Sequence, residues 1–391
     1  MRHFSAAERR ARLAVRHRLA PEAGAGGVVD AVRSVVGLHA SDPPSVFLAA
    51  RARVPGARPE DVERALYEER SLVRMTGMRR TLFVVPLELV PVLQAACTDK
   101  IAAQERRRLV RLIEAGGVAS DGARWVARVE RDTLAAIEER GEAAGAELSE
   151  AVPALRERTR FGEGRRWETT TAVTGRLLVV LAAEGKVVRG RPRGTWISGQ
   201  YRWTPAAAWL GRKFEPVPSE QAEADLARRW LHAYGPAPAA DLKWWAGWTG
   251  AQVQRALTTV GAIEVSLDGA PGVALPDDLD TVAGSEPWAA LLPPLDSTVM
   301  GWAERAWFLG EHAALLFDRN GNAGPTIWWD GRVAGGWGRR RDGEIGVRLL
   351  EDVGAEAEAA VAAEAERLAA WLGPVQFTPR FRTPLERELA D

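Results

Sequence analysis

The stretch that organises the first part of the chain is Val35-Val36-Gly37-Leu38-His39-Ala40-Ser41-Asp42-Pro43-Pro44. Apolar residues at three- and four-residue spacing before it predict a helix over residues 28–38. Pro43 and Pro44 disfavour helical backbone in the residues just before them, so Ser41 and Asp42 are expected in an extended or turn conformation. His39 and Ser41 are two residues apart and would point to the same side of an extended backbone. The pattern is therefore suited to holding a water molecule between two polar side chains.

An ordinary structural interpretation of this stretch stays open beside the functional one. Aspartate before proline is a common turn, and a histidine near a helix C-terminus often only interacts with the helix dipole. The sequence alone does not decide between a catalytic turn and a structural one.

Composition narrows the class of protein. The chain has 391 residues, 46% of them hydrophobic and 27% charged, which is ordinary for a globular protein with several cores. No apolar run reaches the roughly 18 to 20 residues of a membrane span. The single cysteine, Cys97, excludes an internal disulfide framework, and the histidines lack metal-ligand spacing. We expect a cytoplasmic, nucleoid-associated protein without membrane attachment, metal or cofactor.

Net charge is zero, but the charges are unevenly distributed. Residues 1–220 contain 37 basic and 27 acidic side chains, whereas residues 221–391 contain 15 and 25. This asymmetry indicates a first half that faces a polyanion and a second half that is mainly structural.

The first 86 residues are expected to form one domain of helices followed by a hairpin. The hairpin spans residues 71–86, turns at Gly77 and carries Arg74, Arg79 and Arg80 without any acidic residue. Helices followed by a basic hairpin are typical of a winged helix, in which such cations contact phosphates. Residues 87–165 are expected to form a helical connector.

The same pattern returns in residues 166–221. A helix is expected to start at Glu168 to Thr171, and a hairpin follows over residues 186–203. This hairpin has no acidic residue, and aromatic residues alternate with its five cations, Lys186, Arg189, Arg191, Arg193 and Arg202. The combination predicts nucleic-acid binding, although an arginine-rich surface hairpin remains an alternative.

Residues 222–280 repeat the pattern once more without the charge, and residues 281–391 form a last unit. In that unit strands are expected at 287–292, 307–309, 313–317, 326–329, 332–337 and 344–350, followed by a helix over 355–372. The predicted fold class is therefore α+β and mostly helical, with three tandem winged-helix units and a small C-terminal β unit with a terminal helix.

Several motifs together resemble the winged-helix DNA glycosylases of the AlkZ/YcaQ type. The resemblance covers almost the whole chain and is carried by Gly37–Ser41, Met78–Leu82, Leu291–Asp296, Trp328–Trp337 and Pro379–Phe381. It implies three winged helices arranged in a C shape, with a small C-terminal β-barrel, that cradle duplex DNA.

The resemblance also implies an activity and a site. The catalytic motif of that family is glutamine, an aliphatic residue, then glutamine or aspartate, and it lines up with His39, Ala40 and Ser41. The expected protein is a monomeric, monofunctional glycosylase that acts on damaged double-stranded DNA, removes bulky N-alkylated purines such as N7-alkylguanine, and unhooks interstrand crosslinks. His39 would accept a proton from water, Ser41 would orient that water, and Asp42 would add negative charge near an oxocarbenium-like state.

Two other classes of protein remain open at this stage. One is a winged-helix protein without catalytic activity, either a transcription regulator or a protein that only binds damaged DNA. The other is a scaffold that binds RNA or protein.

Overall fold

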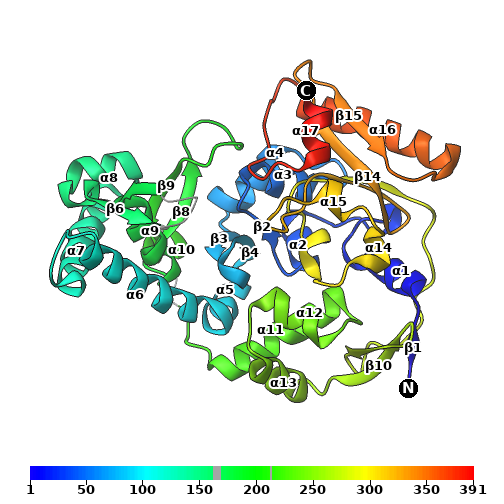
Figure 1. Ribbon diagram of the computed structural model, residues 1–391, viewed down its shortest axis with the longest axis horizontal. Coiled ribbons are helices and arrows are strands. Elements are labelled where there is room, and N and C mark those ends of the chain that lie inside the picture. Colours follow the sequence, from blue (N-terminus) through cyan, green and yellow to red (C-terminus); the bar gives the residue numbers. More distant parts are fainter. Residues whose placement is uncertain (162–168, 212–213) are drawn as a thin grey trace.

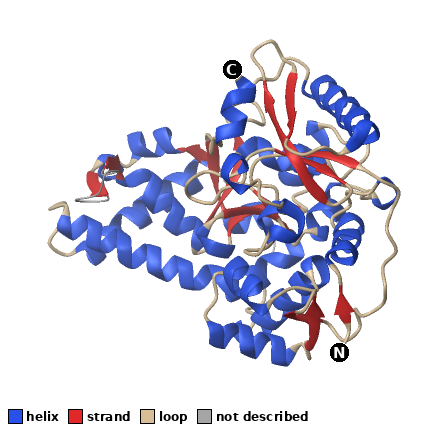
Figure 2. Cartoon of the chain, turned by 45° about the vertical axis from the view of Figure 1, so that its right-hand side comes forward, coloured by secondary structure: helices blue, strands red, loops and turns tan. Residues whose placement is uncertain are grey.

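The computed structural model describes residues 1–161, 169–211 and 214–391. Figures 1 and 2 show a mixed α+β architecture in which helices surround several small sheets. The second unit of the chain lies to the left in Figure 1, and the N-terminal, third and C-terminal parts lie together to the right.

In the first unit the 35–44 stretch contains a short strand and the first residues of a helix. Its elements are α1 (Ala6–Arg16), α2 (Val28–Ser34), β2 (Leu38–His39), α3 (Pro43–Arg51), α4 (Pro59–Glu63), β3 (Leu72–Thr76) and β4 (Leu82–Pro86). The expected helix over 28–38 ends at Ser34, because Leu38 and His39 pair with β4 in a sheet of order β2-β4-β3. Pro43 and Pro44 occupy the first turn of α3, where the missing proline N–H groups cost no hydrogen bond.

The second unit has the same order of strand, helices and hairpin. It contains α5 (Val90–Leu93), α6 (Asp99–Ala115), α7 (Gly122–Arg140), β5 (Ala143–Ala144), α8 (Gly145–Ala151), β6 (Arg158–Phe161), β7 (Thr169–Ala172), α9 (Val173–Ala183), β8 (Val187–Pro192), β9 (Tyr201–Pro205) and α10 (Ala206–Leu210). The sheet order is β5-β9-β8. One core joins Leu109, Val126 and Ile137 to Leu177 and Leu181, so packing crosses the expected boundary at residue 165.

The prediction that a helix begins at residues 168–171 was wrong. Thr169–Ala172 is strand β7, paired with β6, and α9 begins only at Val173. A run of β-branched threonines suits a strand better than a helix. Glu168 lies outside the described residues.

The third unit is built from α11 (Ser219–Tyr234), α12 (Ala239–Ala246), α13 (Gly250–Thr259), β10 (Ile263–Leu267) and β11 (Ala270–Ala274). The N-terminal strand β1 (His3–Phe4) pairs in parallel with β10, and an isolated bridge joins Ala237 to Val273. The first residues of the chain therefore complete the sheet of the third unit.

The C-terminal part contains an open sheet rather than the expected closed barrel. Its strands β12 (Ala289–Leu292), β13 (Thr326–Trp329), β14 (Arg332–Arg339) and β15 (Ile345–Leu349) are antiparallel neighbours in chain order. The remaining elements are α14 (Ala306–Leu309), α15 (Ala313–Leu316), α16 (Gly354–Leu372) and α17 (Pro384–Ala390). The two strands expected at 307–309 and 313–317 are thus short helices. An apolar run this short has no period that separates strand from helix.

Candidate functional site

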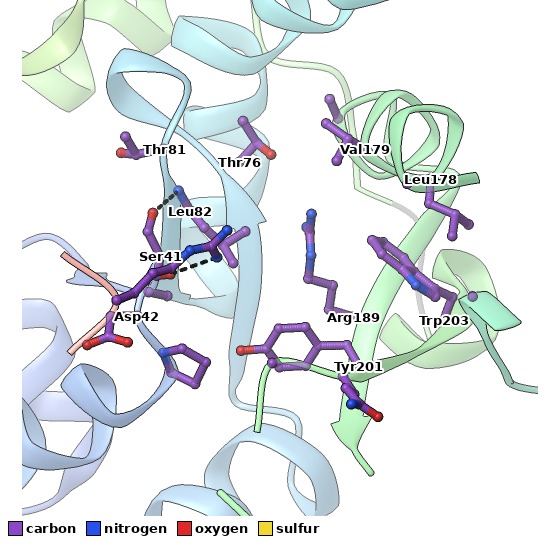
Figure 3. Close-up of a pocket in the computed structure, with 18 of the residues that line it drawn as sticks. Ser41, Asp42, Thr76, Thr81, Leu82, Leu178, Val179, Arg189, Tyr201 and Trp203 are labelled. Atoms are coloured by element: carbon purple, nitrogen blue, oxygen red, sulfur yellow. Dashed lines mark hydrogen bonds between the residues drawn. The ribbon is translucent and has the colours of Figure 1, made fainter. Parts of the chain in front are cut away.

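A cleft of about 1040 Å³ separates the first unit from the second. Figure 3 shows Ser41, Asp42 and Leu82 on one wall, with Arg189, Tyr201 and Trp203 facing them from the hairpin β8–β9. The structure therefore brings the 35–44 stretch and the second basic hairpin, which are about 150 residues apart in sequence, to two sides of one cavity.

Backbone pairing with β4 fixes the position of Ser41. The amide of Ala40 donates to the carbonyl of Leu82 at 2.7 Å, and the amide of Leu82 donates to Ser41 Oγ at 3.4 Å. Ser41 lines the cleft and is partly exposed. Its hydroxyl can still donate to a molecule in the cleft, because its contact with Leu82 uses the oxygen only as an acceptor.

His39 lies behind this wall instead of on it. Its side chain is 5% exposed and packs on Phe83, with the ring centroids 5.0 Å apart. Burial, followed by the positive charge of Arg79, lowers the pKa of His39 to about 3. Its Nδ1 accepts a 3.4 Å hydrogen bond from the amide of Ser41. His39 is therefore neutral at pH 7 and orients the backbone of Ser41.

Besides Glu105, which pairs with Arg80, the acidic residue of the described chain that lines the cleft is Asp42. It is buried, and burial raises the pKa of Asp42 to about 6, although hydrogen bonds from the amide of Arg380 and from Ser45 oppose that shift. Ser45 Oγ lies 3.3 Å from Asp42 Oδ2. A carboxylate has about four acceptor positions, so these two donors leave room for a water molecule.

Arg380 belongs to the site although the sequence patterns did not select it as a site residue. Its Nη1 donates to the carbonyl of Ser41 at 3.4 Å, and it lines the cleft. A C-terminal segment thereby contacts both Ser41 and Asp42. The only signal in the sequence was its place in the Pro379–Phe381 motif of the resemblance.

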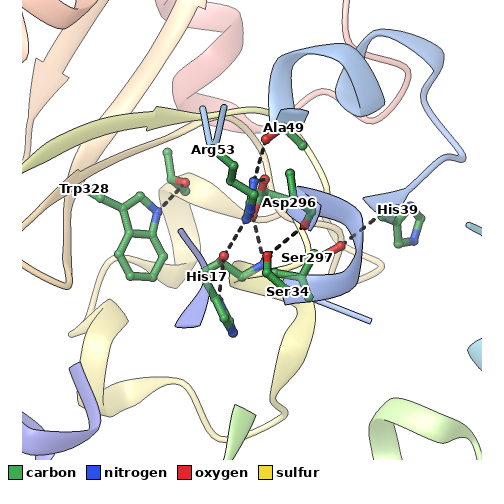
Figure 4. A network of polar contacts seen from close by, with 12 residues as sticks. His17, Ser34, His39, Ala49, Arg53, Asp296, Ser297 and Trp328 are labelled. Atoms are coloured by element: carbon green, nitrogen blue, oxygen red, sulfur yellow. Dashed lines mark hydrogen bonds and ion pairs between the residues drawn. The ribbon is translucent and has the colours of Figure 1, made fainter. Parts of the chain in front are cut away.

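A buried polar network supports the 35–44 stretch (Figure 4). The guanidinium of Arg53 forms two hydrogen bonds, of 2.9 and 2.7 Å, with the carboxylate of Asp296, and both side chains are fully buried. Ser297 Oγ donates to the carbonyl of Gly37 at 2.7 Å and accepts from the amide of His39 at 3.2 Å. The motif Leu291–Asp296 and its two following residues therefore hold the stretch in place.

Two of the eight cations expected to bind DNA are well placed in the cleft. Arg189 lies over the ring of Trp203, 4.7 Å from its centroid, and its Nη1 is buried without a hydrogen-bond partner. Burial lowers the pKa of Arg189 to about 10, which still leaves it charged at pH 7. Arg193 is exposed and also lines the cleft. Both are therefore positively charged side chains that line the cleft.

The other six cations already have partners in the protein. Arg74 is buried between Tyr67, which accepts its hydrogen bond at 3.1 Å, and the ring of Tyr201. The guanidinium carbon of Arg79 lies 3.8 Å from the ring centroid of Trp244. Arg80 lines the cleft, but its Nη2 forms an ion pair with Oε1 of Glu105 at 2.5 Å.

The three remaining cations form ion pairs around the second hairpin. Lys186 contacts Glu130 and Glu184, Arg191 contacts Glu63 and Glu68, and Arg202 contacts Glu142 and Glu147. Much of the basic charge of this hairpin is therefore neutralised within the protein.

In the described part of the chain, no group of three or more histidine, cysteine, aspartate or glutamate residues could hold a metal ion. None of the described helices is long and apolar enough to cross a membrane.

Comparison with solved structures shows that the fold is that of a DNA glycosylase. Streptomyces sahachiroi DNA glycosylase AlkZ matches with a TM-score of 0.73 over 94% of this chain and 97% of that chain, at 21% sequence identity. The profile of the family "DNA glycosylase AlkZ-like" matches residues 32–371. The chain therefore belongs to the AlkZ-like DNA glycosylase family, as the motifs indicated. A search of curated proteins found no match.

Proposed function

We propose that this protein is a monofunctional DNA glycosylase that hydrolyses the N-glycosidic bond of bulky N-alkylated purines, N7-alkylguanine above all, and that it unhooks interstrand crosslinks. The observation that carries the proposal is the cleft itself. Ser41 and Asp42 lie on one wall and the unpaired Arg189 on the other, in a chain of a DNA glycosylase family.

Cleavage of this glycosidic bond needs little general-acid catalysis from the protein. An N7-alkylated guanine is cationic, so the C1′–N9 bond can break with its electron pair passing to the base, which leaves neutral. The sugar becomes oxocarbenium-like and is attacked by water, whose proton must be taken up. Negative charge beside the sugar and a placed water are therefore the main requirements.

Within this proposal Asp42 takes the role of proton acceptor in place of His39. A carboxylate with a pKa near 6 is mostly ionised at pH 7 and basic enough to accept the proton of the attacking water. Ser41 orients that water, and His39 positions Ser41 through their hydrogen bond. The proton then passes from Asp42 to solvent.

We further propose that the three units are winged helices arranged in a C shape around duplex DNA. The sheet orders β2-β4-β3 and β5-β9-β8, each formed by a strand, helices and a hairpin, support this for the first two units. The Ala237–Val273 bridge supplies the corresponding first strand of the third unit. Arg189 and Arg193 would then contact phosphates next to the lesion.

One observation favours a second candidate, a damage-binding protein without catalytic activity. His39 is buried with a pKa of about 3, and Ser41 stands where the family motif has a glutamine or aspartate. The first makes His39 a poor proton acceptor, and the second removes a stronger polar group from the motif. Neither changes the cleft that would hold DNA.

An excision assay separates the two candidates. Duplex DNA with a single N7-alkylguanine is incubated with the protein, and released base and abasic sites are measured. We expect both products from the wild type, and a loss of about tenfold or more in Ser41→Ala because the water is no longer oriented. Tight binding to the lesion without any release would support the damage-binding protein instead.

A further inference from the structure

The wall of the cleft opposite Ser41 includes one face of helix α9. That face shows no charged side chain to the cleft, and its lining residues recur at the spacing of one helical face: Thr174, Gly175, Leu178, Val179 and Ala183. Val179 is 37% exposed and is one of three large hydrophobic residues that are exposed among the described residues. Thr174, Leu178 and Ala183 are buried, so the surface that this face offers the cleft is formed mainly by Gly175 and Val179.

The position of α9 tells which part of a DNA lesion it would meet. It directly precedes the hairpin β8–β9, the place of the helix that enters the major groove in helix-turn-helix modules. Atom N7 of a purine lies on the major-groove edge, so a substituent on N7 projects into that groove. Helices that read undamaged sequence carry arginine, asparagine or glutamine toward the bases, and the cleft face of α9 has none of these.

We infer that the α9 face around Gly175 and Val179 binds the apolar substituent of an N7-alkylated purine. This inference rests on the proposed glycosylase activity and adds a specificity: aromatic or branched alkyl substituents are preferred over a methyl group. Arg189 and Arg193, on the hairpin that shares this wall with α9, would contact phosphates beside the lesion, and Asp42 on the opposite wall would face the sugar. Arg80 and Glu105, which also line the cleft, pair with each other.

The structure offers two substitutions that should leave the fold intact. Val179→Thr keeps the shape of an exposed side chain and replaces one methyl by a hydroxyl. At Gly175, which lines the cleft, an added Cβ would have no neighbour within 4 Å, so the backbone accepts a side chain there, and Gly175→Leu would fill space beside Val179. Replacing a helical glycine by leucine also favours the helix, so the melting temperature should not fall.

The test compares single-turnover excision of N7-benzylguanine and N7-methylguanine from the same duplex. We expect the wild type to release the benzyl adduct faster. Val179→Thr should slow benzyl release by about three- to tenfold and methyl release by less than about twofold, the scale of one lost apolar contact. Gly175→Leu should slow benzyl release by about tenfold or more, because the substituent no longer fits.

The control is Val347→Thr in β15, at a valine of matched exposure, 38%, which does not line the cleft and should change neither rate. If the wild type releases both bases and the α9 variants change both rates equally, the specificity inference is overturned and the glycosylase proposal stands. If the wild type releases neither base, the proposed function itself fails.

Discussion

At the scale of single residues, burial separates the roles of two neighbouring titratable groups. It lowers the pKa of His39 to about 3 and raises that of Asp42 to about 6. Pairs of groups whose environments move their pKa values apart often mark an assignment of acid and base roles. Here the group that titrates near neutral pH is the carboxylate, so the imidazole is left with a positioning role.

Substitution of His39 tests that positioning role. His39→Gln should keep at least about a third of the wild-type excision rate, because a glutamine oxygen can accept the Ser41 amide hydrogen bond. His39→Ala leaves that amide without its partner and opens a cavity beside Phe83, so we expect a loss of about 1–3 kcal/mol in unfolding free energy.

The measurements are urea unfolding and single-turnover excision on both variants. A His39→Gln protein that folds normally but has lost more than about a hundredfold in rate would show that the imidazole takes part in the chemistry.

The sequence predicted the turn at Ser41 and Asp42 because the cause is local: two prolines follow. It could not predict the burial of His39, which depends on Phe83 and on Ser297, more than 250 residues away. Arg380 was missed for the same reason, since only the folded chain brings it to Ser41.

At the scale of elements, the hairpin β8–β9 forms a fixed wall of the cleft. Trp196 at its tip packs on Phe47 and Trp371, with ring centroids 4.9 and 5.7 Å apart. Arg191 adds an ion pair with Glu63 at 2.6 Å. The hairpin was predicted from its alternating residues, but its docking on the first unit was not, because contacts between distant elements leave no periodic signal.

Arg191 is ion-paired within the protein whereas Arg193 is exposed in the cleft, so substitution of these two arginines should affect DNA binding differently. Arg193→Ala should reduce the slope of log binding constant against log salt by about one, the loss of one phosphate contact. Arg191→Ala should leave the slope almost unchanged. The measurement is fluorescence anisotropy on undamaged duplex between 50 and 200 mM salt, which are roughly the conditions where this dependence is steep. Equal slopes for both variants would mean that the hairpin tip leaves its docked position in the complex.

Long, periodic elements were predicted well and short apolar ones were not. The connector expected to be helical contains the long helix α7 over Gly122–Arg140, and α16 was expected over 355–372 and spans Gly354–Leu372. The segments 307–309 and 313–317 hold only a few apolar residues, so their helical form depends on packing against the sheet.

At the scale of the whole molecule, a buried ion pair connects the first unit to the C-terminal part. Arg53 and Asp296 are 243 residues apart and both fully buried. Arg53 also donates to Thr298 Oγ1 at 2.7 Å, and Thr298 Oγ1 lies 2.9 Å from Nδ1 of the buried His17. This network lies directly beneath the stretch that carries Ser41.

Asp296→Asn should therefore be strongly destabilising. Leaving the Arg53 charge buried without its partner is expected to cost about 3–5 kcal/mol. The matched control is Asp225→Asn, which breaks a partly exposed ion pair with Arg229 and should cost less than about 1 kcal/mol. Both are measured by urea unfolding at pH 7, and equal small losses would show that the two parts of the chain fold independently of this network.

In the proposed reaction the carboxylate of Asp42 accepts the proton of the water that attacks the sugar. The pKa of Asp42 in the folded protein, about 6, lies above the ordinary value of 3.8, so the ionised carboxylate is less favourable in the folded protein than in the unfolded chain. The folding stability therefore falls as the pH rises from 3.8 to about 6 and is constant above that. Asp42→Asn removes this cost, so it is not expected to lower stability at pH 8. A loss of activity in this variant would then report on chemistry.

The most direct test is the pH dependence of single-turnover excision of N7-alkylguanine from duplex DNA between pH 5 and 8. We expect the wild-type rate constant to rise with pH through about 6 and then level off. Asp42→Asn should be slower by about 10²–10⁴-fold, and its rate should no longer rise near pH 6. An Asp42→Asn protein with the wild-type rate and the same rise near pH 6 would contradict the claim.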